Sequence, residues 1–350
     1  MTFKHLEDTN KKLASSMEMQ YAGVLEEKSQ SPGLGSPSLG RKLTAVSDSS
    51  ITRQLPDDVM VIDGATGSEL DRRGVDCVLP YWSAGAMIHS PDVLKEVHKH
   101  YLRCGATAIT TNTFNSHKRK LDRAGVGHKA EELVKMAVRL ACEARDEVNP
   151  DALVFGCISS IGMCYDAGEK IDYDILRKEH RDNMQYMVDE GADFLILETM
   201  CTRDDLLAAV ENAEELMPGK WGVCFSLPEE TVGIMRDGTP VKDLIPKLTG
   251  AAFIGVNCMD GKTVAVQVKH LREIVPKKIR IAAYGNIGFW VPPKNYKAGV
   301  KKDNSIKNDA LYAACVKEWL DAGASIVGGC CGTSPDTIRM LNAVVEIWGK

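Results

Sequence analysis

The 350-residue sequence lacks any apolar run that reaches the ~18 residues required of a membrane-spanning helix. Its first 30 residues mix acidic and basic side chains and contain no apolar stretch of signal-peptide length. An excess of positive charge is also missing: the formal net charge is −5 at pH 7, whereas a nucleic-acid-binding surface is normally basic. These absences predict a cytoplasmic protein that binds neither membranes nor nucleic acid.

The beginning of the chain differs from the rest in composition. It contains the Ser/Gly/Pro-rich stretch SQSPGLGSPSLGR at residues 29–41, which can bury little apolar surface. We therefore expect residues 1–52 to form a disordered extension and residues 53–350 to form a single folded domain.

Beyond the extension, short apolar runs alternate with longer amphipathic segments. The runs are apolar nearly throughout, as in strands that are buried on both faces of a parallel sheet. They span residues 59–63, 106–114, 152–159, 193–199, 221–227, 253–258, 280–286 and 325–331. Expected helices begin at Ser90–Pro91 and Ser334–Pro335, and others end at Gly105, Gly191 and Gly323.

Eight such strand–helix units in about 300 residues predict an α/β fold, specifically a (β/α)8 TIM barrel. The alternative is a doubly wound sheet. The G-x-G-x-x-G that would favour its dinucleotide-binding version is absent after the first run.

Polar residues gather where the predicted strands end, which is the catalytic end of a barrel of this kind. They are Asp63, Thr110, Thr111, Asn112, Thr113, Glu198, Thr199, Asn257, Cys258, Tyr284, Asn286, Cys330 and Cys331. None of the eight histidines falls at such an end, and we expect solvated or capping roles for all of them. The predicted mouth is therefore built from thiols, carboxyls, hydroxyls and amides.

The adjacent pair Cys330–Cys331 lies between glycines, in the segment SIVGGCCGTS. A disulfide between neighbouring residues would strain the peptide, so we expect the two thiols to hold a common ligand on irregular backbone. Cys258 ends the sixth predicted strand and would join them. Three thiolates match a zinc site whose fourth position stays open, as in catalytic zinc centres. The spacing alone also allows a core role for Cys258 and a chance doublet at 330–331.

Such a zinc centre suits activation of an incoming thiol, since a coordinated thiol loses its proton and the thiolate is the nucleophile. Asp63 and Glu198 are suited to hold a substrate ammonium. Backbone N–H groups of Gly64, Ala65 and Gly67 are suited to receive a carboxylate. A thiol, an ammonium and a carboxylate together describe a small amino-acid thiol. A turn role for Asp63 and an interior ion pair for Glu198 are the structural alternatives.

Three motifs, DGATGSEL (63–70), GVNC (255–258) and GGCCGTSPDTI (328–338), resemble the signatures of the homocysteine S-methyltransferase family. The resemblance covers residues 56–349. It implies a (β/α)8 barrel in which Cys258, Cys330 and Cys331 bind zinc and act in catalysis, and in which Asp63 and Glu198 hold the amino group of homocysteine. We also assign Gly64 and Asn257 to substrate binding.

The resemblance leaves the methyl donor to be inferred. Trp82, in LPYWSAGAMI (79–88), resembles the tryptophan near the donor in betaine and S-methylmethionine enzymes. Asn115 and Met200 replace aromatic character found in betaine enzymes, and the sequence ends without their oligomerising extension. These features favour S-methylmethionine, with S-adenosylmethionine a further sulfonium donor. Betaine, a methyltetrahydrofolate or corrinoid partner, and a zinc-binding redox sensor remain alternatives, and the oligomeric state stays open.

Overall fold

The computed structural model describes residues 53–77, 82–162, 164, 167, 169–287 and 308–349. The chain divides into two units, Met1–Pro56 and Asp57–Lys350, and the second contains the fold. The predicted extension over residues 1–52 lies outside the described residues. No described helix is both long enough and apolar enough to span a membrane.

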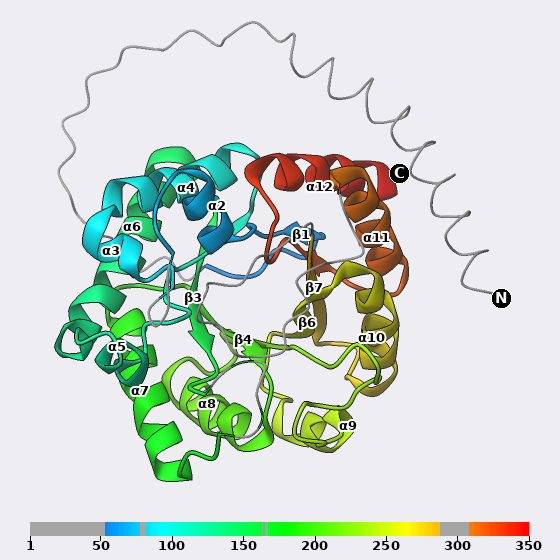
Figure 1. Cartoon of the computed structure of the whole chain (residues 1–350). Helices are drawn as coiled ribbons and strands as arrows, with labels where there is room; N and C mark the ends of the chain where they lie inside the picture. Colours follow the sequence, from blue (N-terminus) through cyan, green and yellow to red (C-terminus); the bar gives the residue numbers. More distant parts are fainter. Residues whose placement is uncertain are drawn as a thin grey trace, which may run out of the picture. The chain divides into compact units, whose positions relative to one another are not determined.

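Eight parallel strands, counted over the described residues, form the barrel at the centre of the second unit (Figure 1). Their order around the barrel is β1-β8-β7-β6-β5-β4-β3-β2. A parallel bridge between Ile62 and Ala108 joins β1 to β2, so each described strand has a neighbour on both sides. The predicted (β/α)8 barrel is confirmed. The strands are β1 (Met60–Val61), β2 (Ala108–Thr110), β3 (Leu153–Ser159), β4 (Phe194–Met200), β5 (Trp221–Phe225), β6 (Phe253–Asp260), β7 (Arg280–Asn286) and β8 (Ile326–Val327).

The helices surround the strands as an outer ring (Figure 1). They are α2 (Thr66–Arg72), α3 (Gly85–His89), α4 (Pro91–Arg103), α5 (Lys118–Asp122), α6 (Ala130–Val148), α7 (Tyr173–Asp189), α8 (Arg203–Leu216), α9 (Val241–Leu244), α10 (Gly261–Ile274), α11 (Asp309–Asp321) and α12 (Pro335–Trp348), with 3-10 turns η1 (Gly127–Lys129) and η2 (Ile245–Lys247). This arrangement buries the strands on both faces, which explains why their sequences are apolar throughout.

Helix boundaries follow the predicted start and stop residues. Ser334 caps α12 through a reciprocal pair of hydrogen bonds with Thr337. Ser90 precedes α4 as predicted, but its side chain makes no capping hydrogen bond there. Gly105, which follows α4, has a φ of +94°, a left-handed conformation that glycine adopts without strain.

Three histidines contradict the predicted solvated or capping roles, because His98, His117 and His180 are fully buried. His180 Nε2 lies 2.6 Å from Oδ1 of Asp205, and the His117 ring meets the His180 ring edge-on with centroids 5.3 Å apart. Burial lowers the pKa of His98 to about 4 and holds the pKa of His117 well below its usual value. These two rings are therefore neutral at pH 7 and pack as core residues.

Candidate metal and substrate site

Three thiols meet at the carboxyl ends of β6 and β8. The Sγ atoms of Cys258, Cys330 and Cys331 all lie within 4.8 Å of one another, and those of Cys258 and Cys331 are 3.7 Å apart. A tetrahedral zinc ion with Zn–S bonds of ~2.3 Å separates two sulfurs by about 3.8 Å. The donor atoms and their spacing therefore fit a zinc ion. Cys258 is buried and the other two cysteines are partly exposed, so the cluster faces the mouth.

Backbone geometry between β8 and α12 presents the adjacent cysteines together. The run at 325–331 leaves strand conformation after Val327, so the thiols are not forced onto opposite faces. Cys330 N donates to the Gly285 carbonyl at 2.9 Å, and Cys331 N donates to Oδ1 of Asn286 at 3.1 Å. A Cβ atom on Gly328 would collide with the Ile62 side chain. Glycine is thus required where this loop passes close to β1.

A bulge on β6 directs Cys258 toward the cluster. Asn257 pairs with Tyr284 and Asp260 with Asn286, so Cys258 and Met259 lie opposite one residue of β7. Cys258 has a φ of +56°, an unusual value for a non-glycine residue. Bulges commonly re-aim a side chain beside an active site, which is the effect of this one.

The thiols of the cluster interact electrostatically. Hydrogen bonds from the Cys258 and Cys330 thiols lower the pKa of Cys331 well below its usual value. The same contacts, together with burial, raise the pKa of Cys330. These contacts thus favour an ionised thiol within the cluster, which is the form that binds a cation.

Asp63 follows β1 and is 2% exposed. Its Oδ2 atom accepts from Thr110 N at 2.8 Å, and the Thr110 hydroxyl lies 3.2 Å from the same oxygen. Burial raises the pKa of Asp63 well above its usual value, the hydrogen bonds from Thr110 oppose that shift, and the nearby charge of Glu198 adds to it. The two carboxyls predicted to bind one ammonium therefore lie close together.

Glu198 lies in a second bulge, on β4. Leu197 pairs with Val223 and Met200 with Phe225, so Glu198 and Thr199 lie opposite a single residue of β5. The Cys157 thiol donates to Oε2 of Glu198 at 2.8 Å. Loss of hydration raises the pKa of Glu198, whereas the contacts from Cys157 and Tyr284 lower it.

Tyr284 is a site residue whose role the sequence did not reveal. Its hydroxyl is buried beside Glu198 but makes no hydrogen bond of good geometry to a described residue. Among the described residues, Thr110 and Cys157 donate hydrogen bonds to Asp63 and Glu198, and the Tyr284 hydroxyl lies beside Glu198; all three are neutral groups. None of these three groups carries a positive charge that could pair with the carboxyl of Asp63 or of Glu198.

The loop after β1 carries the predicted carboxylate-binding groups. Thr333 accepts from Ala65 N at 3.1 Å, so this N–H is already used, contrary to the prediction for Ala65. No described residue accepts from Gly64 N. A Cβ on Gly64 would lie 2.8 Å from Thr333 Oγ1 and 3.0 Å from the Tyr101 hydroxyl, so the loop packs too tightly for a side chain there.

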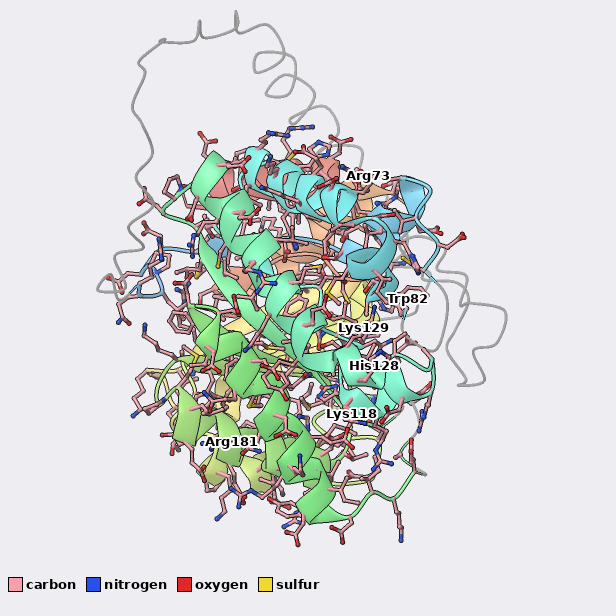
Figure 2. The ribbon with its side chains drawn as sticks, turned by 90° about the vertical axis from the view of Figure 1, so that its left-hand side faces the viewer. Arg73, Trp82, Lys118, His128, Lys129 and Arg181 are labelled. Atoms are coloured by element: carbon pink, nitrogen blue, oxygen red, sulfur yellow. The ribbon has the colours of Figure 1, made fainter. Side chains whose placement is uncertain are left out.

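Trp82 lies next to this loop. A Cβ on Gly67 would be 2.5 Å from Trp82 Nε1, which places the indole against the start of α2. In Figure 2, Trp82 lies on the right-hand side of the molecule with His128, which precedes α6, whereas Arg181 in the middle of α7 lies to the left. Trp82 is therefore at the end of the barrel from which the helices start, which is also the end of the cysteine cluster.

Asn257 lies behind the mouth. It is 1% exposed, its Oδ1 accepts from Thr199 N at 2.9 Å and its Nδ2 donates to Thr199 Oγ1 at 2.9 Å. Both polar atoms of the side chain thus engage the protein. Its direct contact with a substrate stays a prediction.

Fold and site together define a (β/α)8-barrel protein with a three-cysteine centre and two buried carboxyls at one end. The profile of the homocysteine S-methyltransferase family matches residues 60–345. The chain belongs to this family, as its motifs suggested, and is accordingly a methyltransferase.

Relatives and solved structures agree with this assignment. The chain is 28% identical over 305 residues to the homocysteine S-methyltransferase of Escherichia coli K12, covering 82% of this chain and 95% of that protein. It is 30% identical over 312 residues to homocysteine S-methyltransferase 1 of Zea mays, covering 82% and 94%. The metallated form of the Escherichia coli homocysteine methyltransferase MmuM superimposes with a TM-score of 0.69 at 25% identity, covering 82% and 96%.

Proposed function

We propose that this protein transfers a methyl group from a sulfonium donor to the thiol of homocysteine, giving methionine, with zinc held by Cys258, Cys330 and Cys331. S-methylmethionine is the favoured donor. The observation that carries the proposal is the presence, at one end of the barrel, of a thiol cluster and two carboxyls whose described partners are neutral. A zinc ion and a substrate ammonium supply the positive charge that these groups lack.

Zinc, when bound, lowers the pKa of a coordinated thiol so that the thiolate is present at neutral pH. The substrate proton leaves to solvent. Asp63 and Glu198 accept hydrogen bonds from the homocysteine ammonium, and Gly64 N donates to its carboxylate. These contacts hold the sulfur in line with the donor methyl group. Because the nucleophile is already activated, this alignment is the main contribution of the protein to the rate of methyl transfer.

In the transfer step the homocysteine sulfur forms a bond to the methyl carbon. The bond between that carbon and the donor sulfur breaks, and its electron pair stays on the donor. With S-methylmethionine, the donor sulfonium becomes a neutral thioether, so two methionine molecules leave. The indole of Trp82 offers a π face to the donor cation, an attraction worth about 0.5–2 kcal/mol.

Two residues argue against betaine as the donor. Met200 is fully buried, and Oδ1 of Asn115 accepts from the buried Lys120 ammonium at 3.1 Å. The position at which betaine enzymes have a tyrosine therefore lies against a fixed cation. That environment is unsuited to an aromatic cage for a quaternary ammonium.

The test is methionine formation by reduced, zinc-loaded, full-length protein with homocysteine and methyl-labelled S-methylmethionine, with S-adenosylmethionine and betaine in parallel. We expect labelled methionine with S-methylmethionine. Label from betaine alone would overturn the donor assignment. Label that appears only when a methylated corrinoid protein is added would support a partner-dependent enzyme. Zinc loss on mild oxidation without methionine formation under reducing conditions would support a redox sensor.

A cysteine variant tests the metal ligands in the same assay. We expect Cys258→Ser to lose zinc and at least about 100-fold in activity, because three thiolates hold the metal and one becomes a weaker hydroxyl ligand. Cys315→Ser is the matched control, since Cys315 is also buried but belongs to α11. A Cys258→Ser protein with full zinc content and full activity would refute this assignment.

A further inference from the structure

The two bulges that carry Glu198 and Cys258 are connected by one side chain. Asn257 is the residue before Cys258 on β6, and its carboxamide makes both of its hydrogen bonds to Thr199, the residue after Glu198 on β4. Strand β5 lies between β4 and β6, so no ladder hydrogen bonds join these two strands directly. The Asn257–Thr199 contact therefore reaches across β5.

Thr199 is held in a conformation that it would not adopt alone. Its φ is +57°, and a β-branched residue in the left-handed region is a clear outlier. Such backbone persists only when its surroundings determine it from several sides. Here the N–H and hydroxyl of Thr199 bond to Asn257, and its carbonyl accepts from Ser160 Oγ at 3.2 Å and Cys201 Sγ at 3.1 Å.

The two ends of this contact are anchored unequally. Asn257 is paired with Tyr284 as the last residue of the regular β6–β7 ladder before the bulge, and the carbonyl of the following Cys258 accepts from Ser226 Oγ at 3.4 Å. Thr199 depends on side-chain hydrogen bonds within its bulge. Glu198 itself is paired with Ser159 of β3, so loss of the Asn257 carboxamide should free Thr199 and shift the Glu198 side chain rather than its strand, while Cys258 keeps its place.

From this geometry we propose that Asn257 and Thr199 form a clamp that fixes Glu198 relative to the three-cysteine centre. Asn257 is then a positioning residue. It would fix the distance between Glu198, which binds the homocysteine ammonium, and the cysteine centre, where the homocysteine sulfur would bind. This inference rests on the proposed function. It adds a residue-level reason why the site should accept a thiol of one particular length between sulfur and nitrogen.

The test compares two thiols that differ in the ammonium alone: homocysteine and 4-mercaptobutyrate, which lacks the amino group. Their binding to full-length, reduced, zinc-loaded protein is measured by isothermal titration calorimetry, and zinc affinity is measured separately by competition with a chelator. Wild type should prefer homocysteine. Asn257→Ala and Thr199→Val should each weaken homocysteine binding by at least about tenfold, since small displacements of a positioning group are costly. Binding of 4-mercaptobutyrate and zinc should change by less than about threefold.

Two controls separate positioning from stability. Thr199→Ser keeps the hydroxyl that accepts from Asn257 and should keep the wild-type preference. Asn212→Ala removes another buried asparagine, one whose Nδ2 bonds to the Arg177 and Ala208 carbonyls near α8, and should lower stability without changing the preference. Retention of the wild-type preference in Asn257→Ala, or an equal loss for both thiols, would overturn the clamp alone. A wild-type protein with no preference for homocysteine would overturn the proposed acceptor site, and the clamp with it.

Discussion

Asp63 is a carboxyl in a place that disfavours its charged form. Its carboxyl is 2% exposed, and burial raises its pKa well above the usual value. Between the unfolded pKa, near ~4, and the raised folded pKa, the folded protein binds more protons than the unfolded chain. The stability that Asp63 contributes is therefore present at acid pH and is lost as the pH rises through this interval. A bound ammonium would offset the free-energy cost of the buried charged carboxyl. Asp63 therefore contributes to substrate binding at the expense of the stability of the free protein.

We expect Asp63→Asn to flatten the fall in unfolding free energy between pH 5 and pH 8 in reduced, metal-free protein. The asparagine oxygen can still accept from Thr110 N, whereas the buried charge is gone. Homocysteine binding should weaken by at least about 30-fold, as for loss of one partner from a buried charge pair. Urea titrations at four pH values measure the slope, and calorimetry measures binding. The exposed Asp151→Asn variant is the control. A pH slope equal to that of wild type would contradict the account.

At the level of elements, the loop between β8 and α12 presents both thiols and packs closely at two glycines, Gly328 against Ile62 and Gly332 against Ile287. Gly332 has a φ of +85°, and a Cβ on it would collide with the Ile287 carbonyl oxygen. The carbonyl before it, that of Cys331, accepts from Ile287 N at 2.9 Å. Because backbone on both sides is fixed by hydrogen bonds, neither partner can move away cheaply.

We expect Gly332→Ala to lower the unfolding free energy by about 2–4 kcal/mol, combining left-handed strain with overpacking. Zinc affinity should fall as well, because Cys331 precedes the strained residue. Gly219→Ala is a matched control: its φ is +72°, but nothing lies within 4 Å of the added Cβ. It should cost about 1 kcal/mol and leave zinc affinity unchanged. Chemical denaturation and chelator competition measure both quantities. Equal effects at the two glycines would show that crowding at Gly332 is unimportant.

The same elements show how far the sequence could predict the structure. Continuous apolar runs, helix caps and glycine stops report burial and local conformation, so they were sufficient to predict the barrel. The bulges at Glu198–Thr199 and Cys258–Met259 depend on register between neighbouring strands. Local propensity cannot reveal register, and it disfavours a left-handed threonine.

Side-chain partners far apart in sequence were equally hidden. Asn257 was predicted as a substrate contact because it ends a strand beside Cys258. Its bonds to Thr199, 58 residues away, become apparent only once β4 and β6 are placed around the barrel. The roles of Cys157 and Tyr284 at Glu198 were missed for the same reason. Strand-end position predicts that a residue is near the mouth, but not which way its side chain points.

At the scale of the whole molecule, closure of the barrel depends on its first short strand. Met60 N donates to the Ser325 carbonyl at 2.9 Å on one side of β1, and the Ile62–Ala108 bridge forms on the other. Just before β1, Arg280 Nη2 donates to the Asp58 carbonyl at 2.7 Å. The contacts that close the ring thus begin at Asp58, and every proposed site residue comes after it. We therefore propose residues 53–350 as the catalytic domain.

This assignment predicts the result of two truncations. A protein that starts at residue 53 keeps the Asp58 contact, β1 and Asp63, so its zinc content, melting temperature and kcat/KM for homocysteine should stay within about twofold of the full chain. A protein that starts at residue 65 loses β1 and leaves β2 and β8 with unpaired edges, and it should fail to fold or should aggregate. Circular dichroism, metal analysis and the methyl-transfer assay distinguish the two. A tenfold loss of activity in the residue-53 protein with normal stability would show that residues 1–52 contribute to catalysis, and would overturn the proposed domain boundary.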